Sequence, residues 1–224
     1  MSLPKPLLRT IAESSLCLYF LLLPVTAGAK PGKFELPPPS EDDRIIRVDL
    51  LPKFTGKKAD SGSPSNAKQR EARIRSIAEL FSRYNRKLSK KQARQYAEYV
   101  LQAGEKFGQD PFVLASIVVH ESAANAAAVS RGGDYGLMQV RWRIHKKRIM
   151  KEYPSVKKAK DFLDPKINIL MGTEILRDCR AAAGSDLRAG LLRYSAGNKK
   201  LAHRILATKK TLEDAYKKHL RTLK

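Results

Sequence analysis

Apolar positions recur at helical spacing along most of the chain beyond residue 66. Ile74, Ile77 and Phe81 are separated by three and four residues, which places them on one face of a helix from 66 to about 86. A last amphipathic stretch covers residues 201 to 220. The pattern therefore predicts a mainly α domain, which we assign to residues 68–224.

Local capping signals predict where the helices between these two begin. Ser89 and Gln92 have the spacing of a capping box and predict a helix to about residue 107. Asp110-Pro111 and Asp164-Pro165 each place Asp at the cap and Pro at the first helical position. The second of these helices is expected to run to about residue 183.

Gly184 then predicts a stop, and Ser185 is expected to cap a helix through about residue 196. The segment 123–140 lacks helical periodicity, and its glycine-rich run 132–136 requires turns. We therefore expect a helical domain with one short irregular or β-like segment.

A single carboxylate stands at the end of the most apolar predicted helix. Glu121 follows Leu114, Ile117 and Val118 at intervals of seven, four and three residues, so it projects from their face. Desolvation there would raise the pKa of Glu121, as a general acid working near neutral pH requires. Alternatively, Glu121 lies just past the buried part and points into water or pairs with an Arg.

Other chemistries lack their required spacing. His120-Glu121 resembles the start of a zinc-protease helix, but Ala124 stands where the second His is needed. Neither a nucleophile elbow nor a nucleotide-binding loop is present. We expect no metal and no cofactor, and we expect His120 to be structural.

The first 67 residues have the composition of an export signal followed by a linker. Lys5 and Arg9 precede an apolar run from 16 to 25, and Ala27-Gly28-Ala29 predicts cleavage of a signal peptide comprising residues 1–29. The run is too short to span a membrane, so we expect no stable anchor. Residues 30–67 are rich in proline and polar residues and predict a flexible linker.

Charge and cysteine usage narrow the partners. The chain has 44 Lys and Arg against 22 Asp and Glu, which favours a polyanionic partner such as nucleic acid, an anionic membrane or the cell wall. Export makes nucleic acid an unsuitable partner and predicts a periplasmic or secreted protein. Because Cys17 lies in the signal, the mature chain keeps only Cys179 and forms no intrachain disulfide. We expect Cys179 to be buried and unreactive, and the protein to be a monomer.

Motifs from about residue 110 to 206 occur in an order typical of one enzyme family. They are Glu121-Ser122 after the apolar helix, Asn125 with Ala128, Val129 and Ser130, Gly136-Leu137-Met138-Gln139, Asp164-Pro165 with Asn168 and Gly172, and Leu191 to Gly197. Together they resemble the family 1 lytic transglycosylases, the soluble-lytic-transglycosylase-like domain with a lysozyme-like α fold. One departure is Ser195, where the family usually has Asn, which leaves any contact of that side chain open.

The resemblance implies an enzyme that cuts peptidoglycan glycan strands, with Glu121 as its one acid and base and with 1,6-anhydromuramyl ends as products. It implies that Met138 and Gln139 line the glycan cleft and that Tyr194 donates a hydrogen bond to Glu121. The full set of residues expected to bind substrate is Ser122, Ser130, Gly136, Met138, Gln139, Tyr194 and Asn198. Core packing is the alternative for Met138 and Tyr194.

Several alternatives stay open at this point. Asp134 is expected to be a turn residue, but as a second carboxylate it would make the protein a hydrolytic, lysozyme-type muramidase. The basic stretch 141–148 is either a solvated face with Trp142 packed inward or an attractant for wall carboxylates with Trp142 as a sugar platform. A non-catalytic wall-binding protein and a cationic protein acting through charge are the rival classes. The role could be general wall turnover or service to a secretion apparatus.

Overall fold

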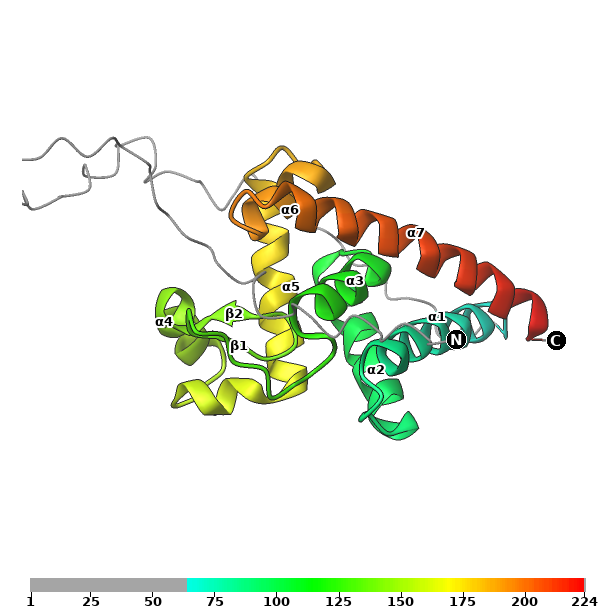
Figure 1. Ribbon diagram of the computed structural model, residues 1–224, viewed down its shortest axis with the longest axis horizontal. Coiled ribbons are helices and arrows are strands. Elements are labelled where there is room, and N and C mark those ends of the chain that lie inside the picture. The colour runs from blue at the N-terminus through cyan, green and yellow to red at the C-terminus, as the bar shows by residue number, and fades with distance from the viewer. Residues whose placement is uncertain (1–63, 224) are drawn as a thin grey trace, which may run out of the picture.

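The computed structural model describes residues 64–223, drawn in colour in Figure 1. The signal expected at 1–29 and nearly all of the linker expected at 30–67 lie outside these residues. The first helix, α1 (Pro64–Tyr84), begins within the last residues assigned to that linker. It thus starts two residues before the helical periodicity becomes visible in the sequence.

The described residues form a mainly α domain, as predicted. Seven α-helices are present within residues 64–223, with one 3-10 helix and a two-stranded antiparallel sheet in the middle of the chain. After α1 they are α2 (Lys90–Phe107), α3 (Pro111–Ser122), β1 (Asp134–Tyr135), β2 (Val140–Arg141), α4 (Trp142–Glu152), η3 (Ala159–Leu163), α5 (Pro165–Ala181), α6 (Leu187–Tyr194) and α7 (Lys199–Thr222). None of the helices found in this part of the chain is long and apolar enough to cross a membrane.

The helix starts predicted from local signals are confirmed. The Ser89 hydroxyl accepts from Gln92 N at 3.2 Å, and Gln92 Oε1 accepts from Ser89 N at 3.0 Å, which completes the capping box of α2. Asp110 caps α3 through Phe112 N, and Asp164 caps α5 through Ile167 N. These starts depend only on neighbouring residues, so the sequence alone is enough to place them.

The predicted start of the sixth helix is wrong by one residue. Asp186, not Ser185, is the cap, and its carboxylate accepts from Ala189 N at 2.6 Å. Ser185 instead has a φ of 67°, a left-handed conformation in the turn after α5. That turn begins earlier than expected, because α5 ends at Ala181, and α6 ends at Tyr194 rather than near residue 196.

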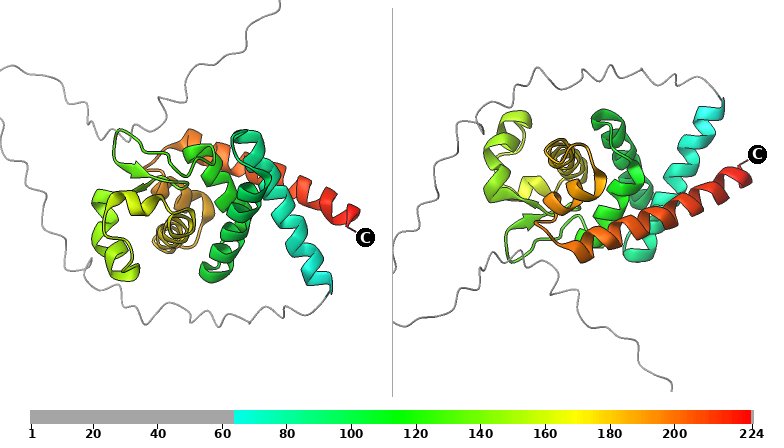
Figure 2. Two further views of the ribbon diagram at one scale, coloured as in Figure 1. Left: turned by 90° about the horizontal axis from the view of Figure 1, so that it is seen from below. Right: turned by 90° about the horizontal axis from the view of Figure 1, so that it is seen from above.

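The hydrophobic core surrounds α3. Its residues from Phe112 to Val119 are at most 7% exposed, and the helix packs against α1, α2 and α7. In Figures 1 and 2, α5 runs between these helices on one side and the small sheet with α4 on the other. The end of α3 therefore meets the irregular segment 123–140 at the centre of the domain.

Candidate active site

A cleft of about 500 Å³ opens where the end of α3, the small sheet, α4, α5 and the α6–α7 turn meet. Its volume falls within the roughly 300–1,000 Å³ typical of small-molecule sites. The lining residues are Glu121, Asp134, Gln139, Val140, Arg141, Ile144, His145, Ile175, Cys179, Arg193, Tyr194, Ser195, Ala196, Gly197, Asn198 and Leu201. Four residues predicted from the sequence, Glu121, Gln139, Tyr194 and Asn198, are among them.

Glu121 occupies the position that the helical periodicity predicts. It follows Leu114, Ile117 and Val118, whose side chains are fully buried, and is itself half-buried at the cleft. Burial raises the pKa of Glu121 to about 7, with a further upward contribution from the charge of Asp134 and a downward one from Arg204. No side chain within residues 64–223 forms a hydrogen bond or ion pair with this carboxyl group. It is therefore half protonated near neutral pH and available to a bound ligand.

Asp134, the second carboxylate in the cleft, is held by protein partners on both oxygens. Arg141 Nε donates to Oδ1 at 2.7 Å and Arg141 Nη2 to Oδ2 at 3.0 Å. The Ser130 hydroxyl also donates to Oδ2, at 2.8 Å. Asp134 is only 5% exposed and begins β1, so it is more than the turn residue expected from its glycine neighbours. Its pairing with Arg141, which lies across the sheet, was not predicted from the sequence.

The expected hydrogen bond from Tyr194 to Glu121 is wrong. The Tyr194 hydroxyl donates to the carbonyl oxygen of Met138 at 2.8 Å instead. A buried carbonyl without a donor is costly, so it competes well for the one proton of the phenol. Burial raises the pKa of Tyr194 well above its usual value, and Glu121 is the next largest cause, so the two groups lie near each other. Tyr194 thus holds the backbone beside Glu121 rather than the acid itself.

Gln139 lines the cleft in a constrained conformation. Its φ is 48°, and its side-chain amide donates to Gly136 O at 2.9 Å and to Ala128 O at 3.2 Å. Ala196, which also lines the cleft, has a φ of 50°. Positive φ values are costly for residues with a Cβ and tend to persist at functional sites.

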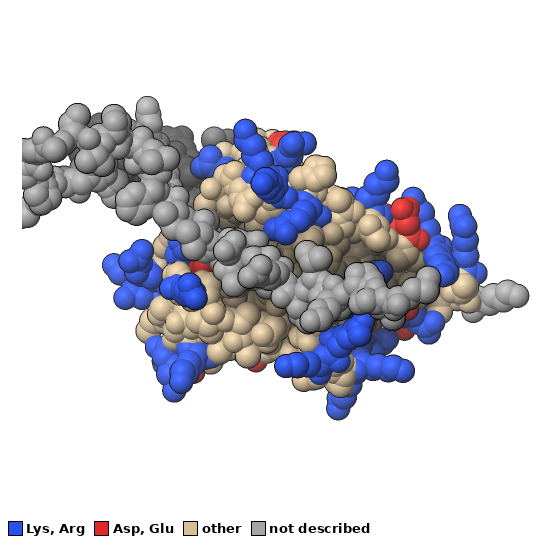
Figure 3. All heavy atoms as spheres, viewed as in Figure 1, with Lys and Arg blue, Asp and Glu red and all other residues tan. Residues whose placement is uncertain are grey.

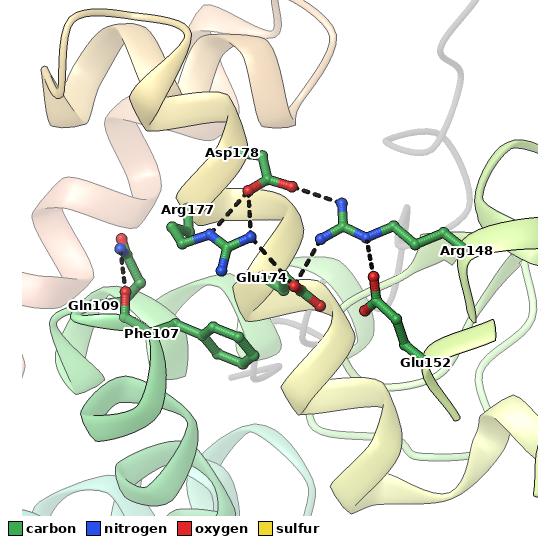
Figure 4. A network of polar contacts seen from close by, with 7 residues as sticks. All are labelled: Phe107, Gln109, Arg148, Glu152, Glu174, Arg177 and Asp178. Carbon is green, nitrogen blue, oxygen red and sulfur yellow. Dashed lines mark hydrogen bonds and ion pairs between the residues drawn. The ribbon is translucent and has the colours of Figure 1, made fainter. Parts of the chain in front are cut away.

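The wall formed by α4 and α5 is fixed by an ion-pair network, shown in Figure 4. Arg148 reaches from α4 to Asp178 at 2.6 Å and Glu174 at 2.8 Å on α5, and also binds Glu152 at 3.0 Å. Helix α4 was not predicted, because only Ile149 in it is buried and no side chain caps its start. Ion pairs join it to acidic residues of α5 that are distant in the sequence, and helical periodicity does not reveal such pairs.

The chain also matches a known protein family. The family model described as "Transglycosylase SLT domain" matches residues 98–217, more than half of the 224 residues. The chain belongs to the SLT-domain family. The matched range encloses the 110–206 segment that carries the sequence resemblance.

Two curated relatives also match, both named endo-type membrane-bound lytic murein transglycosylase A, from two strains of Klebsiella pneumoniae. Each is 32% identical over 98 residues, which cover 42% of this chain and 47% of the relative. The chain thus spans about half the length of the curated relatives it matches.

Within the SLT domain, Met138 packs in the core and does not line the cleft, contrary to the expectation. It is fully buried, and a Cβ built on Gly172 would stand 2.6 Å from its sulfur. The absence of a side chain at Gly172 is what gives Met138 its space. Its unbranched side chain suited either role, which is why the sequence could not decide between them.

Three further residues expected to bind substrate shape the SLT domain instead of lining its cleft. Ser122 donates to Leu137 O at 2.9 Å, so it fastens the end of α3 to the segment before Gln139. Ser130 binds Asp134 as described above. Gly136 has a φ of 74°, and a Cβ there would come within 2.4 Å of the buried Asn168 amide.

The end of α6 carries the remaining predicted features. Asn198 lines the cleft and caps α7 by accepting from Leu201 N at 3.0 Å. Ser195, the departure from the family pattern, also lines the cleft but donates to Leu191 O at 2.8 Å. Its hydroxyl is thus used within the helix end, and at 6% exposure little of it is accessible.

Three other side chains complete the comparison with the sequence. Cys179 is half-buried at the cleft wall rather than fully buried, and burial raises the pKa of its thiol, which disfavours the reactive thiolate. His120 bonds Thr208 Oγ1 at 2.8 Å and packs edge-on against Tyr84, so its expected structural role is confirmed. Trp142 packs against Phe162 away from the cleft, which supports the inward reading over a sugar platform.

Proposed function

We propose that this protein is a peptidoglycan lytic transglycosylase that cleaves the β-1,4 bond between N-acetylmuramic acid and N-acetylglucosamine. The observation that carries the proposal is Glu121, whose pKa is raised to about 7 by burial at the cleft of an SLT domain. A carboxyl group in that environment supplies a proton at neutral pH without the help of a metal. The transglycosylase names of the two partial relatives support the same reaction.

In the first step, protonated Glu121 donates its proton to the glycosidic oxygen as the bond to the muramyl C1 breaks. The 2-acetamido oxygen of the same sugar attacks C1, which is the substrate-assisted route. In the second step, the Glu121 carboxylate removes the proton of the 6-hydroxyl, and O6 attacks C1 to displace the acetamido oxygen. The products are a 1,6-anhydromuramyl end and a new non-reducing end, and Glu121 regains its proton.

The pairing of Asp134 supports a mechanism with one free carboxylate. Its oxygens already accept three hydrogen bonds from Arg141 and Ser130. Leaving those partners to attack a sugar or activate water would break all three of these hydrogen bonds to a buried carboxylate. Asp134 therefore acts on Glu121 through its charge, which raises the pKa of Glu121 and keeps the acid protonated.

Because Asp134 still lines the cleft, lysozyme-type hydrolysis is the second candidate function. It would need Asp134 to position water or to act as nucleophile. It differs from the proposed reaction in leaving a reducing muramic acid end.

The activity is tested on purified peptidoglycan sacculi. Wild-type protein clears the suspension, and Glu121→Gln does not, because the amide keeps the shape but donates no acidic proton. Glu105→Gln is the matched control, since Glu105 is exposed on α2 outside the cleft. Clearance by a folded Glu121→Gln protein would refute the assignment, and failure of wild type to clear would favour a non-catalytic wall-binding role.

We also propose that the protein acts outside the cytoplasm, in the periplasm or after secretion. The signal-like residues 1–29 and the cell-wall substrate of the proposed reaction support this. Export followed by N-terminal sequencing tests it. The expected mature N-terminus is Lys30, and a chain retained in the cytoplasm would contradict the proposal.

A further inference from the structure

One cation in the cleft has no acidic partner. The cleft is lined by four charged side chains besides His145, of which Glu121 is the proposed acid and Asp134 and Arg141 pair with each other. The fourth is Arg193, and no hydrogen bond or ion pair joins it to any other side chain in the part of the chain the structure describes. An arginine that lines a ligand site and has no acidic partner of its own is a candidate anion-binding group.

Arg193 is the second-to-last residue of α6, directly before Tyr194, and its side chain is exposed. Helix α6 packs against α5, and Cys179 of α5 lines the same cleft as Arg193. Ile175 also lies on α5, and Ile144 on α4 is 64% exposed at the cleft. This part of the cleft thus combines apolar surface with one cation, whereas the part around Glu121 is formed by the end of α3 and the small sheet.

We propose that Arg193 binds a carboxylate of the acidic substituents carried by the glycan strand. The inference rests on the proposed function and identifies a carboxylate as the feature of the substrate that this part of the cleft binds. Muramic acid carries a lactyl group, whose carboxylate is either free or extended by a peptide with its own carboxylates and methyl groups. A guanidinium fork recognises a carboxylate through two parallel hydrogen bonds, and the isoleucines contact the methyl groups.

Two simpler roles for Arg193 must be separated from this one. A cation in the last turn stabilises a helix by interacting with the negative end of the helix dipole. In addition, the chain has a net charge of +22, and Figure 3 shows Lys and Arg side chains spread over the visible face, so any anionic polymer is attracted. Arg188 is a matched control for the general charge, since it is an exposed arginine on the same helix that does not line the cleft. Strands without carboxylates control for the helix-dipole role, because losing that role would weaken binding of both kinds of strand equally.

The test measures binding in the Glu121→Gln background, so that the strands stay intact. Soluble glycan strands are prepared with peptides and after amidase treatment, which leaves the free lactyl carboxylate. Half of each preparation is amidated with methylamine to neutralise every carboxylate. Calorimetry then gives Kd for Glu121→Gln alone and combined with Arg193→Gln, Arg193→Lys or Arg188→Gln.

Arg193→Gln is expected to raise Kd about three- to tenfold on strands with carboxylates and less than about twofold on amidated strands. Arg193→Lys recovers part of the loss because it keeps the charge without the fork. Loss on peptide-bearing strands alone assigns the peptide carboxylates, and loss on amidase-treated strands assigns the lactyl group.

An equal loss on amidated strands, or an equal loss from Arg188→Gln, overturns the proposal. These outcomes are independent of turnover. Wild type that binds strands in this carboxylate-dependent way but does not cleave them would refute the proposed function and leave the role of Arg193 standing.

Discussion

The two carboxylates of the cleft come from regions built in different ways. Glu121 ends a helix whose buried residues exclude water, and no other side chain of the described residues binds its carboxyl group. Asp134 begins a two-residue strand and is bound by Arg141 across the sheet and by Ser130 in the preceding turn. Burial therefore raises the pKa of Glu121 to about 7, whereas Asp134 is held as the partner of a cation.

The difference indicates that surroundings, not residue type, separate the proposed acid from the proposed supporting charge. Within residues 64–223 no side chain pairs with the Glu121 carboxyl group, which supports its proposed role as the acid. In the proposed reaction Asp134 takes no chemical part, because both of its oxygens already accept hydrogen bonds from Arg141 and Ser130. Each variant below alters one side of this contrast.

The largest expected effect is on turnover and falls on one carboxylate only. Glu121→Gln lowers kcat by about a thousandfold, within the range for loss of a general acid. Asp134→Asn lowers kcat by less than about fivefold, because in the proposed mechanism Asp134 takes no part in breaking the bond. The kcat of folded protein on soluble strands is the measurement. Losses of similar size at both positions would show that both carboxylates take part.

The second effect is on stability and falls on the Asp134 side. Arg141→Gln leaves the buried Asp134 charge with one partner fewer and lowers the free energy of unfolding by about 2–3 kcal/mol. Arg143→Gln, an exposed neighbour on α4, changes it by less than about 0.5 kcal/mol. Urea titration of both variants measures the difference. An unchanged midpoint for Arg141→Gln would mean that the ion pair does not hold the sheet.

The third effect is a dependence of stability on pH that belongs to Glu121. Its pKa is raised from 4.5 to about 7 in the folded protein, so the folded state binds more protons than the unfolded state between these values. Its contribution to the free energy of unfolding is therefore present at pH 4 and lost as pH rises through 7. Relative to wild type, Glu121→Gln gains about 1–3 kcal/mol between pH 4 and pH 8, after allowance for partial exposure.

Urea unfolding of wild type and Glu121→Gln at pH 4, 6 and 8 measures this gain. Glu105→Gln, at an exposed residue outside the cleft, is measured alongside as the control. A constant difference between wild type and Glu121→Gln across the three pH values would show that Glu121 titrates like an exposed carboxyl group.

The smallest effect links the two carboxylates through charge. Because Asp134 raises the pKa of Glu121, Asp134→Asn should lower it, and the alkaline limb of kcat/KM should move to lower pH. The full pH profile of kcat/KM for this variant is the measurement. A limb that stays in place or moves to higher pH would rule out the electrostatic link.

Much of the fold was predictable because its signals are local. The capping box at Ser89 and the Asp-Pro starts of α3 and α5 need only neighbouring residues. The error at Ser185 arose because two adjacent residues can both cap a helix, and only the backbone of the turn decides between them. Helix α4 was missed because the ion pairs that join its Arg148 to α5 involve Glu174 and Asp178, which are too distant in the sequence for a local pattern to show.

The candidate site likewise contains residues whose place depends on local signals and residues whose place depends on packing between distant elements. The position of Glu121 followed from helical periodicity, since that argument stays within one element. The partner of Tyr194 did not, because packing between different elements decides which acceptor the hydroxyl meets, and it meets Met138 O. Arg193 was passed over because a single exposed arginine has no sequence signal, and only the cleft shows its place.

The central claim, that Glu121 acts without a second carboxylate, is tested most directly by the masses of the muropeptides released from sacculi. If the acetamido group and Glu121 act together, the tethered 6-hydroxyl captures C1 ahead of bulk water by effective concentration. Mass spectrometry should then find mainly non-reducing 1,6-anhydromuramyl ends, one water lighter than the hydrolysis products. A majority of reducing muramic acid ends would contradict the claim and make the protein a lysozyme-type hydrolase.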